Sequence, residues 1–144
     1  MEAIHIRQAT QDDFEYVCDF VDQLENDRFD RKKQLEIYLE NAANPNNIYL
    51  MAWAHLIPVG FLSCHVQSLL HHGGLVGEIQ EMFVSENGRS HGIGKLLVEK
   101  LIEMATARGV LQLEVTSGLS RENAHRFYER EGFAHTHKKF TLKL

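Results

Sequence analysis

The segment of this chain that says most about its fold is Glu78-Ile-Gln-Glu-Met-Phe-Val-Ser-Glu-Asn-Gly-Arg-Ser-His-Gly-Ile-Gly-Lys95. Its first part is apolar and strand-like, its middle is a turn, and Arg89 to Lys95 form a glycine-bearing loop that opens a long amphipathic helix. The free backbone N–H groups at the start of such a helix, together with the helix dipole, favour a bound anion. The segment therefore predicts a strand–loop–helix unit with a phosphate-binding site, and the phosphate at such a site most often belongs to a cofactor.

Two common phosphate-binding loops do not fit this stretch. A P-loop requires Gly-Lys followed by Ser or Thr, with another Gly earlier in the loop. Here Leu96 follows Gly94-Lys95, and Arg89 stands at the earlier position. A dinucleotide-binding loop requires a third Gly beyond Gly94, where this chain has Leu97. The pattern that is left is Arg-x-x-Gly-x-Gly after a strand.

A second motif lies downstream of the loop. Arg121-Glu-Asn-Ala-His-Arg-Phe-Tyr-Glu-Arg-Glu-Gly-Phe133 joins a helical segment to a Glu-Gly-Phe ending, and the strand-like segment from Leu111 to Thr116 separates it from the loop. In order and spacing, the two motifs resemble the GNAT superfamily of N-acetyltransferases, and the resemblance covers nearly the whole chain. Shorter strings, such as Leu70-His71-His72 and His137-x-x-Phe140-Thr141, resemble the aminoalkylphosphonate N-acetyltransferases.

The composition indicates one globular domain. Of 144 residues, 44% are hydrophobic and 24% charged, and we expect a single N-acetyltransferase domain over residues 1–144. The net charge of −5 argues against nucleic acid as a partner, because nucleic-acid-binding domains usually present a basic face. Neither a signal peptide nor a membrane span is expected. The two cysteines suit a reducing cytoplasm, and the resemblance implies a bacterial enzyme.

Hydrophobic periodicity predicts alternating strands and helices. Helices are expected at 14–24, 35–42, 93–109 and 121–131, and strands at 4–7, 48–54, 59–67, 75–85, 111–116 and 140–144, the last perhaps pairing with another near Phe133. This order is that of the GNAT fold. It is an α/β single domain with a mixed, mostly antiparallel sheet flanked by about four helices.

The resemblance implies acetyl-CoA as cosubstrate. The loop would hold its pyrophosphate mainly through backbone N–H groups, the preceding strand end would hydrogen-bond pantetheine, and a helical Asn would contact the cofactor. The residues expected to bind it are Phe83, Val84, Arg89, Ser90, His91, Gly92, Ile93, Gly94, Lys95 and Asn123. The alternative interpretation involves no cofactor. The glycines would then only allow the backbone conformation that the start of a helix needs, and Phe83 and Val84 would be ordinary core residues.

Three residues are candidates for proton transfer. Tyr128 matches the position of the superfamily's general acid, and a phenol keeps its proton until a basic thiolate forms nearby. Glu78, ranked first, and Glu81 are candidates for the base, because a carboxylate in an apolar strand is costly without a role or partner. Strand alternation puts them on opposite faces unless a bulge intervenes. A solvated strand-face carboxylate is the alternative for either.

A histidine pair, His71-His72, is the candidate for substrate contact, with exposed loop histidines as the alternative. The closer resemblance implies an anionic, phosphonate-bearing amine, for which cations could come from Arg28, Arg31, Lys138 and Lys139. No metal ligands are assigned, because the spacing is loose. A divalent metal that assists the reaction stays open, as does a plain metal-binding module built from His65, His71, His72 and Glu78.

Together these features predict an enzyme that moves an acetyl group from acetyl-CoA to the primary amine of a small molecule. An aminoalkylphosphonate is the favoured acceptor, and its neutral amine would attack the thioester directly. A protein or peptide N-acetyltransferase and a non-catalytic CoA-binding sensor are the alternatives. A homodimer that pairs through edge strands is also expected, because small domains of this class often pair in this way.

Overall fold

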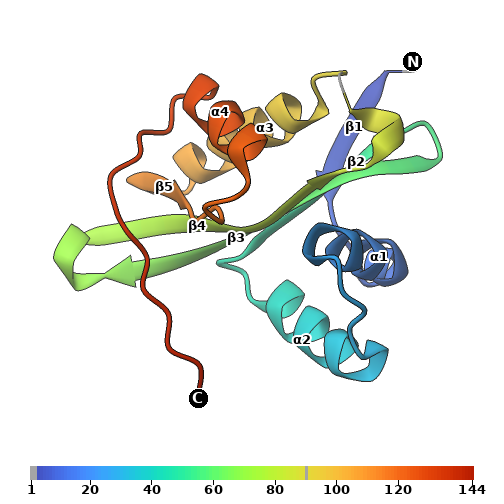
Figure 1. Cartoon of the computed structure of the whole chain (residues 1–144), viewed down its shortest axis with the longest axis horizontal. Helices are drawn as coiled ribbons and strands as arrows, with labels where there is room; N and C mark the ends of the chain where they lie inside the picture. The colour runs from blue at the N-terminus through green and yellow to red at the C-terminus, as the bar shows by residue number, and fades with distance from the viewer. Residues whose placement is uncertain (1–2, 90) are drawn as a thin grey trace.

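The computed structural model describes residues 3–89 and 91–144, and a five-stranded sheet forms its centre. The strands are β1 (Ile4–Gln8), β2 (Ile48–Ala54), β3 (Ile57–Leu69), β4 (Gly74–Val84) and β5 (Gln112–Val115). They lie in the order β1-β2-β3-β4-β5, with β5 parallel to β4 and the other pairs antiparallel. The mixed, mostly antiparallel sheet predicted from the sequence is confirmed (Figure 1).

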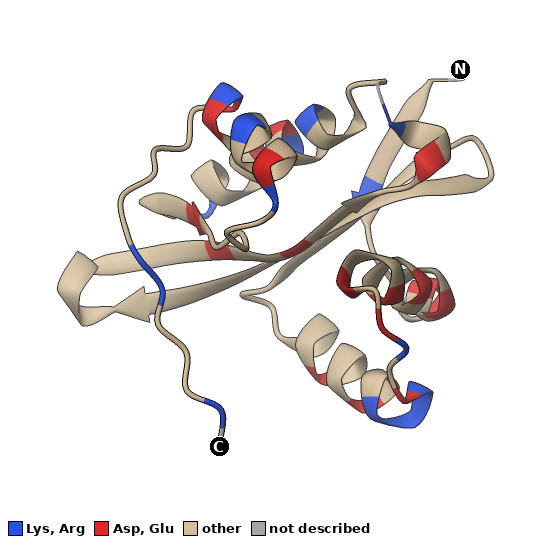
Figure 2. Ribbon diagram, in the orientation of Figure 1, with Lys and Arg blue, Asp and Glu red and all other residues tan. Residues whose placement is uncertain are grey.

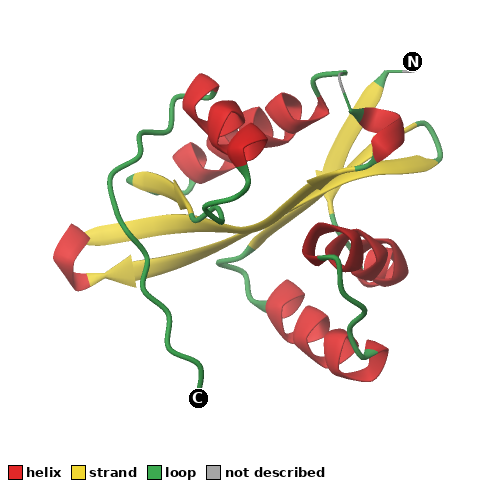
Figure 3. Cartoon of the chain, viewed as in Figure 1, coloured by secondary structure: helices red, strands yellow, loops and turns green. Residues whose placement is uncertain are grey.

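Helices cover both faces of the sheet. α1 (Phe14–Glu25) and α2 (Arg31–Ala43) lie on one face, and α3 (Ile93–Ala107) and α4 (Glu122–Arg130) lie on the other (Figure 1, Figure 3). Short 3-10 turns occupy Gln11–Asp13, Leu70–His72 and Glu86–Gly88. None of the helices in the described residues has the length and apolar character that crossing a lipid bilayer requires.

The sheet separates two hydrophobic cores. On the α3 face, Leu62 of β3 packs with Leu97 of α3, and both side chains are fully buried. On the α1–α2 face, Tyr49 and Phe61 pack with Phe20 of α1. Burying one such side chain contributes roughly 1.5–3 kcal/mol, so the alternation of apolar residues along β2 and β3 holds both layers of helices against the sheet.

A bulge interrupts β4. The register between β3 and β4 pairs Glu81 with Ser63 but then skips Gln80, which is the extra residue. Uninterrupted alternation would put Glu78 and Glu81 on opposite faces. Because of Gln80, both lie on the face that also carries α1 and α2. The sequence analysis allowed for a bulge that would put both glutamates on one face, and the structure has this bulge.

The prediction of strands at the C-terminus is wrong. Residues 133–144 form no strand (Figure 3), and Phe140 and Leu142 are 89% and 85% exposed. An alternating apolar pattern makes a strand only where a neighbouring edge offers hydrogen-bond partners. In Figure 1 the segment leaves α4, passes β5, crosses in front of β3 and β4 and ends below the sheet, and it pairs with none of these strands.

An ion pair between the partly exposed Arg7 and the buried Asp13 joins β1 to the turn before α1. Arg7 Nη1 and Nη2 donate to the Asp13 carboxylate at 2.7 and 2.9 Å, and the Thr10 N–H donates to it at 2.7 Å. Asp13 is only 2% exposed. Burial by itself would raise the pKa of Asp13, but the hydrogen bonds from Arg7 and Thr10 outweigh it and hold this pKa below its usual value.

We predict that Asp13→Asn lowers the free energy of unfolding by about 2–3 kcal/mol at neutral pH, because it leaves Arg7 without its charged partner. Since the folded-state pKa is lowered, the stabilisation is present above the unfolded-state pKa and is lost as the pH falls through the folded-state pKa. Urea unfolding of variant and parent at neutral and acidic pH should show a difference that shrinks in acid. An equal loss in the exposed neighbour variant Asp12→Asn would contradict the assignment.

Candidate active site

β4 and β5 separate part-way along β4. β5 pairs with β4 only from Val76 to Ile79, whereas β4 continues to Val84. Beyond Ile79, the backbone N–H and C=O groups on this side of β4 have no β5 residue opposite them, and such groups need partners. The opening is therefore suited to a ligand that hydrogen-bonds as a strand does.

Phe83 and Val84, two of the predicted cofactor contacts, lie at this end of β4. The Phe83 ring packs in the core with its centroid 5.3 Å from that of Phe20, so only the Phe83 backbone is available to a ligand. The Val84 carbonyl accepts a hydrogen bond from Arg89 Nε at 3.2 Å. Arg89 therefore ties the loop to the strand end and leaves the backbone N–H groups of the loop as its anion-binding feature.

The loop enters α3 through two glycines with different roles. Gly92 has a φ of +71°, a left-handed conformation that favours glycine. At Gly94, a Cβ would lie 3.2 Å from both Met82 Cε and Phe127 Cε1, so glycine permits close approach of α3 to β4 and α4. The N–H groups of residues 93–95 have no carbonyl partner within the helix, and the helix dipole adds positive charge there.

The other expected cofactor contacts surround this helix start. His91 and Lys95 are exposed on either side of Gly92. Asn123 lies exposed in the first turn of α4, where its Oδ1 accepts a hydrogen bond from Arg126. Ser90 lies outside the described residues, so its assignment stays a prediction from the sequence.

Tyr128 is half-buried on α4 between two aromatic rings. Its ring centroid lies 5.3 Å from that of Phe127 and 5.6 Å from that of Phe133, with both pairs edge-on. Burial raises the pKa of Tyr128, and the nearby positive charge of Arg121 opposes this more weakly. The phenol is therefore protonated at neutral pH, as an acid catalyst must be, and packing and proton donation are compatible roles for it.

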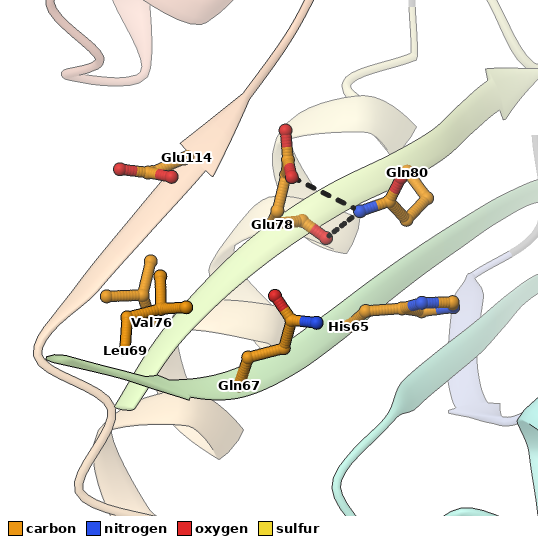
Figure 4. A pocket seen from close by; sticks show the side chains of 7 residues that line it. All are labelled: His65, Gln67, Leu69, Val76, Glu78, Gln80 and Glu114. Atoms are coloured by element: carbon orange, nitrogen blue, oxygen red, sulfur yellow. Dashed lines mark hydrogen bonds between the residues drawn. The ribbon is translucent and has the colours of Figure 1, made fainter. Parts of the chain in front are cut away.

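A cavity of about 230 Å³ opens on the same face of the sheet as α1 and α2. Side chains from three adjacent strands line it (Figure 4): His65, Gln67, Leu69, Val76, Glu78, Gln80 and Glu114. Glu78 and Glu114 are register partners across β4 and β5, so two carboxylates lie side by side. The Thr116 hydroxyl donates to Glu78 Oε2 at 3.2 Å. The cavity is thus an anionic site suited to an amine.

The bulge places Glu81 on this face but outside the cavity lining. The Ser63 hydroxyl donates to the Glu81 carboxylate, and the Ser63 oxygen accepts from the Glu81 N–H at 3.0 Å. Ser63 is fully buried. Of the two carboxylates predicted from the sequence, Glu78 is the one that lies in the cavity, whereas Glu81 already has a structural partner.

The predicted histidine pair lies at the turn between β3 and β4, next to the cavity but not in its lining. The ring centroids of His71 and His72 are 4.4 Å apart, and His72 Nε2 lies 3.9 Å from Glu114 Oε2. His65 is the histidine that lines the cavity, where its Nε2 lies 2.9 Å from the Tyr49 hydroxyl. Over the described residues, no group of three or more His, Cys, Asp or Glu side chains is placed to hold a metal ion.

The cations considered for an anionic substrate lie elsewhere. Arg31 Nη2 forms ion pairs with Asp22 at 2.8 Å and Asp19 at 3.0 Å, which occupy its charge. Arg28 borders the same hollow between α1 and α2. Lys138 and Lys139 belong to the exposed C-terminal segment. The structure therefore does not bring these residues to the cavity within a single chain.

Three polar residues of the lining were missed by the sequence analysis. A signal existed for Glu114, because it alternates with Leu113 and Val115 and must therefore point away from the core that they join. No comparable signal existed for Gln67 and Gln80. Their placement depends on the β3–β4 register and its bulge, and neither can be read from one strand alone.

Comparison with known proteins shows the family to which this chain belongs. Residues 6–133 match the profile of the acetyltransferase (GNAT) family. This chain belongs to the GNAT family. It is 33% identical over 144 residues to the aminoalkylphosphonate N-acetyltransferase of Salmonella typhimurium, and the match covers 100% of this chain and 94% of that protein.

Solved structures share the fold of this GNAT chain. A transcriptional regulator from Bacillus halodurans superposes with a TM-score of 0.90 at 25% identity, covering 99% of this chain and 100% of the other. An aminoglycoside antibiotic 6'-N-acetyltransferase from Acinetobacter baumannii superposes with a TM-score of 0.84 at 16% identity, covering 99% and 98%. The family and its named relatives make this chain an N-acetyltransferase.

Proposed function

We propose that this GNAT enzyme transfers an acetyl group from acetyl-CoA to the primary amine of a small aminoalkylphosphonate. The observation that carries the reaction is the opening between β4 and β5. The start of α3 lies beside Met82 in the uncovered end of β4, and Glu78 lies in the cavity at the paired end. The acceptor class is supported by the Salmonella relative, which matches this chain over the full 144 residues.

The residues at the opening fit acetyl-CoA. The backbone of the Arg89–Lys95 loop would hold the pyrophosphate, and the unpaired side of β4 near Phe83 and Val84 would hydrogen-bond the pantetheine arm. The side chain of Asn123 would add a contact from α4. Acetyl-CoA, when bound, supplies the thioester whose carbonyl carbon the amine attacks.

In this proposal Glu78 accepts a proton from the amine, and Tyr128 donates a proton to the leaving sulfur. Glu78 takes a proton from the incoming ammonium group, so that the nitrogen lone pair is free to attack. The N–C bond forms as the C–S bond breaks, and the nitrogen releases its second proton to solvent. Tyr128, on the α4 side, gives its proton to the departing sulfur and recovers one from solvent. Glu81 is the second candidate for the base.

A second acceptor class is supported by the charge of the cavity. Its lining includes Glu78 and Glu114, and none of the described residues that line it is Lys or Arg. Two adjacent carboxylates favour an acceptor with a second positive charge, such as a diamine. Such an acceptor would give the same chemistry with a different specificity.

Thiol release from acetyl-CoA tests the proposal. The panel is 2-aminoethylphosphonate, its carboxylate analogue, a diamine and a lysine peptide, each with and without a divalent metal. Faster turnover of the phosphonate than of its carboxylate analogue supports the proposal. Faster turnover of the diamine or of the peptide would show that the acceptor is not an aminoalkylphosphonate. Binding of acetyl-CoA without turnover of any amine would favour the non-catalytic sensor.

We predict that Tyr128→Phe lowers kcat by about 100-fold or more, because the departing sulfur loses its proton donor. The affinity for acetyl-CoA should change little, since the ring packing is kept. Because burial raises the pKa of Tyr128, the parent enzyme should lose this acid only above the ordinary tyrosine pKa of about 10. Steady-state kinetics with direct cofactor titration measures both effects, and an unchanged kcat would remove Tyr128 as the acid.

We predict that Glu78→Gln lowers kcat/KM by about 100-fold or more near neutral pH, because the amide cannot accept the proton of the ammonium group. The matched variant Glu81→Gln should cost much less, since Glu81 lies outside the cavity and is held by Ser63. Both variants would be assayed with the same amine and saturating acetyl-CoA. The reverse order of losses would make Glu81 the base.

We predict that Gly92→Glu weakens acetyl-CoA binding by about tenfold or more, through like charge and loss of the loop conformation. Gly109→Glu is the matched control, because Gly109 also has a positive φ, +78°, and open space around a Cβ, but lies at the far end of α3. Both variants should lose similar stability. Calorimetric titration with acetyl-CoA that finds equal affinity in the two variants would show the loop assignment to be wrong.

A further inference from the structure

Three polar side chains form a row across the sheet. The register pairs His65 of β3 with Glu78 of β4, and Glu78 with Glu114 of β5. All three line the cavity (Figure 4), and neighbouring strands lie about 4.7–4.9 Å apart. The row therefore has two carboxylates at one end and an imidazole at the other.

The strands around the cavity carry no fixed positive charge. β3, β4 and β5 contain no Lys or Arg, and their charged residues are Glu78, Glu81 and Glu114 (Figure 2). An aminoalkylphosphonate has an anionic group a few bonds from its amine. The carboxylates attract the ammonium group but repel the phosphonate, so the phosphonate needs a donor elsewhere in the lining.

His65 is the donor in the lining that is best suited to an anion. The other side-chain N–H donors of the lining are the amides of Gln67 and Gln80, and the Gln80 amide is turned toward Glu78 (Figure 4). An amide stays neutral, whereas an imidazole can gain a positive charge beside an anion. His65 also lies at the end of the row farthest from Glu114.

The Tyr49 hydroxyl determines which ring nitrogen of His65 is occupied. His65 Nε2 lies 2.9 Å from this hydroxyl, and the two rings stack with centroids 5.7 Å apart and planes 15° apart. Burial raises the pKa of Tyr49 to about 12, so the hydroxyl keeps its hydrogen at neutral pH. The Asn41 side chain hydrogen-bonds to the same hydroxyl and opposes this rise, as a donor to the phenol oxygen does.

These contacts leave Nδ1–H of His65 for a ligand. Because the Tyr49 oxygen accepts from Asn41, its O–H donates to Nε2, and a neutral ring then has its hydrogen on Nδ1. A protonated ring has a hydrogen on Nδ1 as well. Within residues 3–89 and 91–144, Nδ1 has no hydrogen-bond partner. In both protonation states His65 therefore offers one N–H to the cavity.

We propose that His65 binds the anionic group of the acceptor through Nδ1–H, while Glu78 and Glu114 face its amine. Tyr49 is then a positioning residue, because it acts on the acceptor only through His65. This role of His65 rests on the proposed aminoalkylphosphonate acceptor and adds the residue that recognises its phosphonate. A zwitterionic acceptor of this kind matches the row, since its two charges lie over the two ends.

Steady-state kinetics with 2-aminoethylphosphonate and saturating acetyl-CoA tests the role of His65. His65→Leu removes the N–H and should raise KM by about tenfold or more, as expected for one lost charge-assisted hydrogen bond. The value of kcat should change little, because Glu78 and Tyr128 are unchanged. His65→Asn, whose amide can place an N–H near the position of Nδ1, should recover part of the affinity. An unchanged KM in His65→Leu would overturn the proposal.

Two controls separate recognition of the anion from a general effect on the fold. His5→Leu makes the same substitution at an exposed histidine of β1, at the opposite edge of the sheet from β5, and should leave KM unchanged. Ethylphosphonate keeps the anionic group and lacks the amine, and phosphorus NMR titration should show about tenfold weaker binding to His65→Leu than to the parent. Equal binding to both, or an equal loss in His5→Leu, would show that His65 does not recognise the anion.

The positioning role of Tyr49 has its own readout. Tyr49→Phe keeps the ring and removes the hydroxyl, so it should raise KM for 2-aminoethylphosphonate several-fold but raise it no further in the His65→Leu background. Nitrogen-15 NMR of the parent, at a pH where the ring of His65 is neutral, should find the hydrogen on Nδ1. Effects of the two substitutions that multiply, or a neutral ring with its hydrogen on Nε2, would remove Tyr49 from this role.

Failure of the acceptor is distinguishable from failure of His65. Turnover of the diamine or the lysine peptide without turnover of 2-aminoethylphosphonate would reject the proposed acceptor, and the role of His65 with it. Turnover of 2-aminoethylphosphonate with the same KM in the parent and in His65→Leu would keep the acceptor and reject only His65.

Discussion

The extra residue in β4 is the constraint on which the site depends. The pairing with β3 skips Gln80, and this one-residue shift reverses the faces of all residues before it relative to those after it. It turns Glu78 toward the α1–α2 face, where the cavity opens, while Ile79 stays in the α3 core. Without the bulge, a carboxylate would replace Ile79 in an apolar core, which is costly.

The separation of β4 from β5 follows from lengths and packing. β5 ends at Val115 while β4 continues to Val84, and α3 begins beside that free end. The contact of Gly94 with Met82 and Phe127 brings α3 and α4 close to β4. The start of α3 therefore lies beside the part of β4 that β5 does not cover, and Glu78 lies in the cavity on the opposite face of the sheet.

The C-terminal segment shows the limit of pattern reading within one chain. Alternating Phe140, Leu142 and Leu144 predict a strand, but this segment pairs with no strand and these side chains stay exposed. Hydrogen-bond partners for a strand are always non-local. An alternating apolar pattern therefore does not by itself make a strand.

Hydrophobic periodicity predicted the four helices and the five strands of the sheet, because buried faces repeat with the period of a helix or a strand. The same reasoning predicted C-terminal strands that do not form. The loop glycines and Tyr128 were predicted as site residues because each belongs to a contiguous motif, and their roles in the reaction stay predictions. Only the tertiary structure decided that Glu78 and Glu114 meet, that Glu81 is held by Ser63, and that the predicted histidine pair lies outside the cavity lining. Register, bulges and strand edges are set by residues distant in the chain, and no local pattern records them.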